Sequence, residues 1–346
     1  MIQAALGDRT RRAESPGLWT LAWRRFCRDR VGLASFLVVL VFFGLMLASG
    51  LGLVAADWSK EVGVFYAPPT FTVHAPSAHI AAAPASPRSE GAANPADPLA
   101  GVLAEIRAEE GGKASAAEAR SPTLAFGGDR WGRDVLKKAV KGTETSMFVG
   151  LVAAALTALL GTVFGALAGY YGRWIDDFFN WFYSIFTSVP YLLLILAIAA
   201  VLNQKGTMTV ILILSLTGWT GIFRLVRAEY LKHKVREYIQ AADAIGASHA
   251  RRMFVHILPN VSHVVLVQLS LHVVLFIKSE VVLSFLGFGV GVDTVSWGSM
   301  LNEAQSELIL GYWWQLAAAT LAMALLVTGF SLFTDALRDA LDPKLK

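Results

Sequence analysis

The side chains best suited to catalysis or metal binding are scattered along the second half of the sequence. His249 and His256 are seven residues apart and could share one face of a helix, but no third ligand follows them at a metal-binding spacing. The sequence has no HExxH pair and no serine elbow, and no paired-carboxylate site emerges from it. We therefore predict no catalytic residue, no metal site and no cofactor site.

The sequence also lacks a phosphate-binding loop of the Walker A type. Its nearest approach is Gly111-Gly112-Lys113-Ala114, which has neither the upstream glycine nor the hydroxyl residue after the lysine. We therefore expect that the protein is not an enzyme, and that any ATP hydrolysis it depends on occurs in a separate ATPase.

Polar side chains interrupt one long apolar run, and these residues are Gln268, His272, Lys278 and Glu280. Ionisable groups inside a membrane helix are typical of secondary transporters and channels that work alone, so this class is the alternative function. Lys278 and Glu280, however, lie on nearly opposite faces of a helix at 100° per residue, and both are close enough to its outer end to snorkel. A role in helix packing or along a translocation path is favoured, and the individual roles of Lys278 and Glu280 stay open.

The composition indicates that the solvent of this chain is a lipid bilayer. Of 346 residues, 55% are hydrophobic and 16% are charged, against roughly 25% charged in soluble domains. Roughly 20 helical residues cross the bilayer core, and six apolar runs reach that length. They are residues 31–56, 146–169, 178–202, 207–227, 260–285 and 312–334. The sequence therefore predicts an all-α integral membrane protein with six transmembrane helices, and Pro190 predicts a kink in the third of them.

The runs divide the chain into four parts. Residues 1–30 are polar and arginine-rich, residues 31–56 form the first membrane helix, and residues 131–346 contain the other five helices. The first run is long for a signal peptide, although Ala55-Ala56-Asp57 would permit cleavage after it. Residues 57–130 form an insert rich in Ala, Pro, Gly and Ser, which we expect to be a flexible loop with one short helix near 99–110.

Basic residues border the apolar runs, so they indicate topology rather than nucleic-acid binding. The N-terminal segment carries Arg9, Arg11, Arg12, Arg24, Arg25, Arg28 and Arg30, and the connection between the fourth and fifth runs carries Arg224, Arg227, Lys232, Lys234, Arg236, Arg251 and Arg252. The 286–311 connection has three acidic residues and no Lys or Arg. Both termini and residues 229–258 are therefore predicted to be cytoplasmic, and 57–130 and 286–311 to lie outside.

The cytoplasmic segment 229–258 carries the strongest local pattern. Tyr238, Ala241, Ala242 and Ile245 fall at helical spacing, which predicts a short amphipathic helix with a small exposed stripe. Gly246 suits the left-handed position that ends such a helix, and Ser248 can cap the next turn, as a residue of its type often does. Leu258 before Pro259 is expected to be extended, with Pro259 at the start of the fifth membrane helix. Such a structured loop is typical of a docking element.

This segment resembles the cytoplasmic loop of permease subunits in ATP-binding-cassette (ABC) importers, where Glu-Ala-Ala is followed by a glycine and later by Leu-Pro. The matching positions are Ala241, Ala242, Gly246, Leu258 and Pro259, with Gln240 in place of the usual glutamate. Residues 126–136 are similar to the Gly-Thr-Asp-x-x-Gly-Arg-Asp-Val signature of dipeptide and oligopeptide permeases, with Gly128 replacing threonine. The turn 169–176 and the stretches 283–289, 296–298 and 337–343 resemble the same family, whereas the 60–122 insert does not.

The resemblance implies a second-permease-type subunit of the dipeptide/oligopeptide/nickel importer family in the bacterial inner membrane, with the six-helix type I importer fold. It implies a homologous permease as partner, two ATPase subunits and an extracytoplasmic substrate-binding protein. It also implies a coupling helix that docks on the ATPase, with Glu237, Tyr238, Gln240, Ala241, Ala242, Ile245, Gly246, Leu258 and Pro259 as its residues. Peptides are the first expectation for the solute, and nickel chelates, opines and sugars stay open.

Overall fold

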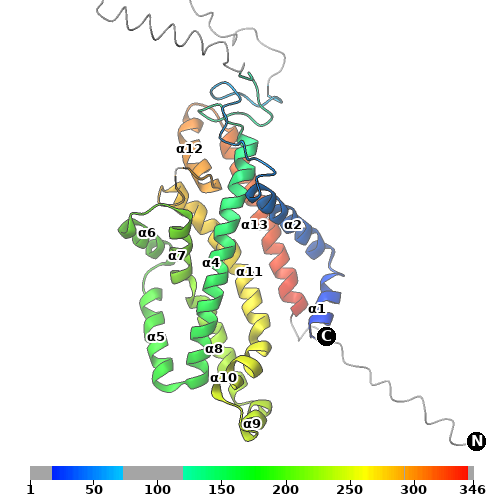
Figure 1. Ribbon diagram of the computed structural model, residues 1–346, viewed down its shortest axis with the longest axis vertical. Coiled ribbons are helices and arrows are strands. Elements are labelled where there is room, and N and C mark those ends of the chain that lie inside the picture. Colours follow the sequence, from blue (N-terminus) through cyan, green and yellow to red (C-terminus); the bar gives the residue numbers. More distant parts are fainter. Residues whose placement is uncertain (1–17, 73–119, 292, 342–346) are drawn as a thin grey trace, which may run out of the picture.

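The computed structural model describes residues 18–72, 120–291 and 293–341, and these residues are predominantly helical (Figure 1). The predicted helix near 99–110 lies outside them. The helices are α1 (Leu18–Phe26), α2 (Arg30–Gly50), α4 (Val135–Tyr171), α5 (Arg173–Thr187), α6 (Tyr191–Leu202), α7 (Thr207–Gly218), α8 (Thr220–Lys234), α9 (Glu237–Ala244), α10 (His249–Arg251), a π-helical turn (Arg252–Ile257), α11 (Leu258–Phe285), α12 (Trp297–Ile309) and α13 (Trp314–Leu341).

Five helical stretches are long and apolar enough to cross a membrane, and a bent pair makes up to six. The five are Arg30–Gly50, Val135–Tyr171, Thr207–Lys234, His249–Phe285 and Trp314–Leu341. The bent pair, α5 and α6, corresponds to the predicted run 178–202, and its two helices meet at 83°. The all-α prediction is confirmed, and the third run is broken more sharply than the kink expected at Pro190.

Helix α4 is the central element of the bundle and packs against α2, α7, α8 and α11 (Figure 1). Gly161, Gly165 and Gly169 recur every four residues along it and face α8. A Cβ atom on Gly165 would lie 2.8 Å from the carbonyl oxygen of Phe223, and one on Gly169 would lie 2.7 Å from that of Arg227. Small residues at this spacing allow the two backbones to approach closely, which favours association of membrane helices.

Residues 57–72 and 120–134 form a compact cap over one end of α4 (Figure 1). Backbone bridges join Gly63 to Ser121 and Pro69 to Leu124, and Ala67 between them is fully buried. The Tyr66 ring stacks on Tyr312, before α13, with centroids 4.2 Å apart. The expectation of a flexible loop is therefore wrong for these residues, because pairing between segments far apart in sequence leaves no local periodic pattern.

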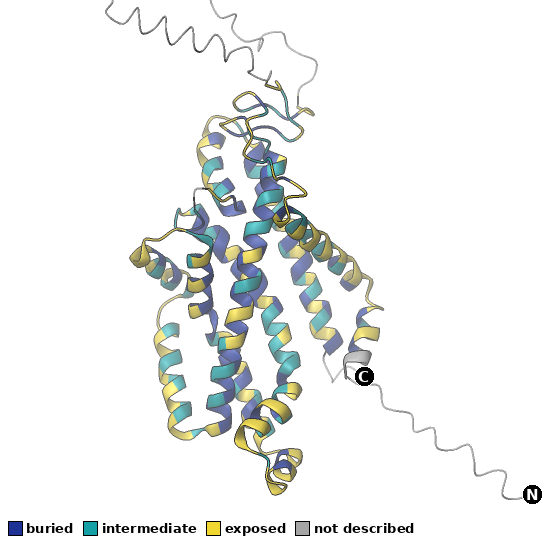
Figure 2. Ribbon diagram, in the orientation of Figure 1, coloured by how far each residue is buried: buried dark blue, intermediate teal, exposed yellow. Residues whose placement is uncertain are grey.

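Burial is concentrated on α4, α7, α8 and α11, whereas α2, α5 and α6 carry many exposed apolar side chains (Figure 2). Leu37 on α2, Trp181 on α5 and Leu193 on α6 are among them. Large exposed apolar surfaces mark contact with lipid or with another protein, so these helices form the outer surface of the bundle.

Candidate functional site: the 229–258 segment and the polar cluster beneath the cap

The segment between α8 and α11 forms a separate small lobe at the end of the molecule opposite the cap (Figure 1). Helix α9 spans Glu237–Ala244, and Gly246 follows it with a φ of +80°, in the left-handed region that glycine adopts most easily. The Ser248 hydroxyl accepts a hydrogen bond from the Arg251 N–H and so caps the next turn. The predicted helix, glycine stop and serine cap are confirmed.

The predicted exposed stripe of α9 is divided between two faces. Ile245 is 85% exposed and Tyr238 38%, whereas Ala242 is only 5% exposed and lies with buried Ile239 on the inner face. Ile239 packs in a cluster that includes Tyr230 and Met253. The prediction that Ala242 shares the outward stripe is therefore wrong, because α9 needs its own apolar inner face to pack against the rest of the lobe.

The approach to α11 also differs from the prediction at Leu258. This residue is helical, with φ of −54° and ψ of −42°, and the helix continues from Arg252 through Pro259. The π-helical turn explains how, because the Leu258 N–H donates to the carbonyl of Met253, five residues back. This wider turn takes the place of the expected extended break, and Pro259 sits in the first turn of α11.

Side-chain contacts brace the lobe against the membrane helices. The buried Tyr230 hydroxyl donates to the Met253 carbonyl at 3.1 Å, and Asp243 of α9 forms an ion pair with Arg252. A cavity of about 300 Å³ beside α9 has a lining of aromatic, polar and basic side chains. Its lining residues are Tyr170, Tyr171, Lys234, Ile239, Gln240, Asp243, His249 and Arg252. Helix α9 is thus attached to the rest of the lobe through Ile239 and Asp243, while Tyr238, Ala241 and Ile245 are exposed.

A second polar cluster lies at the other end of the molecule, beneath the cap. The Lys138 ammonium is 1% exposed and donates to Asp129 at 2.9 Å, and it also pairs with Glu303 of α12. Asp129 in turn accepts hydrogen bonds from the backbone N–H groups of Trp131 and Arg133. No sequence pattern indicated a role for Lys138 or Glu303, and of the three residues only Asp129 lies in the 126–136 motif.

Two further buried carboxyl groups lie near this end. Glu280 accepts hydrogen bonds from Ser146 and Ser284, each at 2.7 Å, while Lys278 is exposed on another face of α11. The inference that Lys278 and Glu280 do not pair is confirmed, but Glu280 is buried rather than snorkelling. Glu307 of α12 accepts from the Arg130 N–H at 3.2 Å, and burial raises its pKa to about 7.

Comparison with known proteins decides the class of this chain. Residues 161–346 match the family described as binding-protein-dependent transport system inner membrane component. The chain is 38% identical to the dipeptide transport system permease protein DppC of Bacillus subtilis over 221 residues, which cover 64% of this chain and 69% of that protein. The chain belongs to this permease family.

Other relatives agree. The chain is 37% identical to the oligopeptide transport system permease protein OppC of Bacillus subtilis, over 64% of this chain and 72% of that protein. It is 34% identical to the glutathione transport system permease protein GsiD of Pectobacterium atrosepticum, over 64% and 73%. The protein is thus a multi-pass inner-membrane permease subunit of an ABC importer, and ATP hydrolysis and initial solute binding belong to partner proteins.

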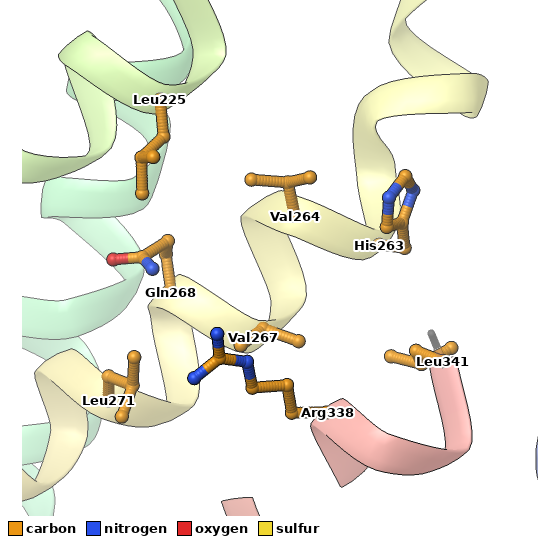
Figure 3. Close-up of a pocket in the computed structure, with 8 residues that line it drawn as sticks. All are labelled: Leu225, His263, Val264, Val267, Gln268, Leu271, Arg338 and Leu341. Carbon is orange, nitrogen blue, oxygen red and sulfur yellow. The ribbon is translucent and has the colours of Figure 1, made fainter. Parts of the chain in front are cut away.

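The permease also has a cavity of about 310 Å³ between α8, α11 and α13 (Figure 3). Its walls are mainly apolar, and Arg338 extends from α13 toward Gln268 on α11 (Figure 3). Two polar residues of the 260–285 run, His263 and Gln268, line this cavity. His272 packs by its ring against Phe276 of the same helix.

Proposed function

We propose that this permease imports peptides or related small solutes together with a homologous permease, and that residues 229–258 dock on the ATPase subunits. The observation that carries the docking proposal is Ile245, a large apolar side chain 85% exposed at the tip of a braced helix. Val235, Tyr238 and Val255 of the same lobe are also exposed, and several exposed apolar side chains on one lobe are typical of an interface. The relatives are named for dipeptides, oligopeptides and glutathione, which supports a peptide solute.

The docking residues divide by their place in the lobe. Glu237, Tyr238, Gln240, Ala241 and Ile245 are exposed on α9 or just beyond it and would contact the ATPase directly. The other four docking residues would act indirectly, because they position α9. Ala242 packs α9 against the lobe, and the backbone conformation at Gly246, Leu258 and Pro259 determines how the chain leaves α9 and enters α11.

We also propose that this lobe and both termini are cytoplasmic, and that 57–130 and 286–311 face outward. Helix α1 and the last turns of α13 lie toward the same end as α9, which supports one side for all three (Figure 1). The four-part division of the chain follows from this orientation, with 131–346 as the five-helix core.

Cysteine labelling tests the orientation. In a Cys27→Ser background, Ala250→Cys within the lobe and Ser306→Cys on α12 each place a thiol at an exposed position. A membrane-impermeant maleimide applied to cells with a permeabilised outer barrier should label position 306 and leave position 250 unlabelled. After the cells are lysed, the reagent should also label position 250. Labelling of position 250 before lysis would show that the lobe faces outward, contrary to the proposed topology.

Reconstituted uptake tests the function itself. Proteoliposomes that contain this permease, its sister permease and the ATPases should accumulate a radiolabelled dipeptide only with ATP and the binding protein. Omission of either should reduce uptake at least tenfold, because energy and solute capture reside in those partners. Uptake by this permease alone, without ATPase subunits, would instead support a self-sufficient transporter.

A further inference from the structure

A cavity of about 260 Å³ opens at the outer end of the molecule, beside the Lys138 cluster. The cap, the loop after α6, the connection between α11 and α12, and α12 itself contribute its walls. Among its lining residues are Trp58, Arg130, Arg133, Lys205, Gly289 and Glu303. Residues that are distant in sequence therefore line one cavity, and no residue of the 229–258 segment is among them.

Positive charge predominates in this cavity. Lys138 is balanced by Asp129 and Glu303, so that trio carries one net negative charge. Arg130, Arg133 and Lys205 contribute three positive charges, and none of them forms an ion pair with a carboxylate among the described residues. The remaining balance favours an anion.

Arg133 has the features of a preorganised anion ligand. Its backbone N–H donates to the Asp129 side chain at 3.0 Å, and its carbonyl accepts from the Asp129 N–H at 3.0 Å. Its guanidinium lies 5.5 Å from the ring centroid of Trp58 and 5.9 Å from that of Trp131. These cation–π contacts hold the planar group in place without neutralising its charge.

The Arg133 side chain also has an unsatisfied donor. Its Nε atom is buried and has no hydrogen-bond partner among the described residues. A buried donor without a partner is costly, but protein atoms cover Nε, so a ligand cannot reach it. A carboxylate would instead bind the two terminal nitrogens of the guanidinium, which make no hydrogen bond to the described residues.

Glycine shapes the loop after α11, which lines part of this cavity. A Cβ on Gly289 would lie 1.9 Å from the Ser284 hydroxyl, so this position cannot hold a larger residue unless the loop moves. Gly287, two residues earlier, has a φ of +85°. Ser284, Val290 and Asn302 line the cavity beside these glycines.

We propose that this cavity binds the terminal carboxylate of the transported solute, with Arg133 as the main ligand and Arg130 and Lys205 as supporting charges. The inference rests on the proposed function, since it assumes that this end faces outward and that the solute is a peptide. The cavity volume of about 260 Å³ is close to the lower end of the roughly 300–1,000 Å³ that is typical of small-molecule sites, so the cavity has room for one end of a peptide.

Binding of matched dipeptides to the purified permease in nanodiscs tests the proposal. Calorimetric titration should show that alanyl-alanine binds at least tenfold more tightly than its C-terminal amide, while the N-acetylated dipeptide binds like the parent. Arg133→Gln should weaken alanyl-alanine binding at least tenfold and abolish the preference over the amide. Lys205→Gln, at an exposed loop position, should weaken binding by a smaller factor even if Arg133→Gln fails to fold.

Arg120→Gln is the matched control. Arg120 is also a cap arginine near an aromatic ring, Phe65, but it is ion-paired with Glu61 and does not line the cavity. This variant should bind alanyl-alanine like the wild type. The carboxylate site would be overturned by any of three results: equal binding of the dipeptide and its amide, unchanged binding by both Arg133→Gln and Lys205→Gln, or no binding by the wild type.

ATP-driven uptake separates this site from the proposed function. If uptake persists in those three cases, the proposed import function still stands. If binding depends on the carboxylate but no uptake occurs, only the import function is contradicted.

Discussion

Replacement of Ile245 by glutamate is expected to weaken ATPase binding about 30-fold or more. If this exposed side chain enters an apolar recess of the partner, the substitution buries an unpaired charge, which typically costs about 2–5 kcal/mol. Each 1.4 kcal/mol corresponds to about a tenfold change in affinity. Titration of purified ATPase subunits onto labelled permease measures the change, and transport and transport-linked ATP hydrolysis should fall with it.

Ile309→Glu provides a matched control for this experiment. Ile309 is 87% exposed at the end of α12, so it matches Ile245 in residue type and exposure but lies near the opposite end. This control should keep wild-type ATPase affinity. Full ATPase affinity and full transport in Ile245→Glu would show that the tip of α9 is not part of the docking surface.

Ala242→Glu separates docking from the integrity of the lobe. Since Ala242 is buried within this chain, the glutamate should first unseat α9 from its inner contacts and only thereby reduce docking. Loss of ATPase binding should then accompany increased proteolysis of residues 237–258, whereas Ile245→Glu should leave proteolysis unchanged.

Removal of the Lys138 ammonium is expected to produce the largest loss of stability. In Lys138→Met, buried Asp129 and partly buried Glu303 lose their shared counter-ion. Breaking a buried ion pair from one side typically costs about 3–5 kcal/mol, because the remaining charge stays out of water. Denaturant unfolding in detergent, followed by tryptophan fluorescence, should register this loss. Adding Asp129→Asn should recover part of it.

Lys137→Met is the neighbouring control on the same helix. Lys137 forms an ion pair with Asp57 at 2.7 Å, and the Lys137 side chain is 40% exposed and that of Asp57 38%. This pair lowers the pKa of Asp57, but exposed ion pairs contribute little to stability. A loss in Lys137→Met as large as that in Lys138→Met would mean that burial does not set the strength of the Lys138 interaction.

Local sequence patterns determined much of this protein. The long apolar runs predicted an all-α membrane bundle, because the bilayer requires every spanning segment to satisfy its own backbone hydrogen bonds. The spacing within 237–248 predicted α9, its stop at Gly246 and the cap at Ser248, because these features depend on backbone preferences of neighbouring residues. Helical spacing also separated Lys278 from Glu280 onto different faces, as the structure confirms.

Tertiary packing decided what those patterns left open. Small residues such as Ala242 suit either a docking face or an inner face. The packing of Ile239 with Tyr230 and Met253 decided which face of α9 is buried, and Ala242 lies on that face. The cap pairs Gly63 with Ser121, and the Lys138 cluster joins Lys138 to Glu303, which is 165 positions away, so no local periodic pattern predicts either of them. Leu258 stayed helical before Pro259 because a π-helical turn formed against the lobe. The sequence determined which segments enter the membrane and where short helices end, since those depend on solvent and neighbouring residues; contacts between distant segments decided which side chains remain available to a partner or a solute.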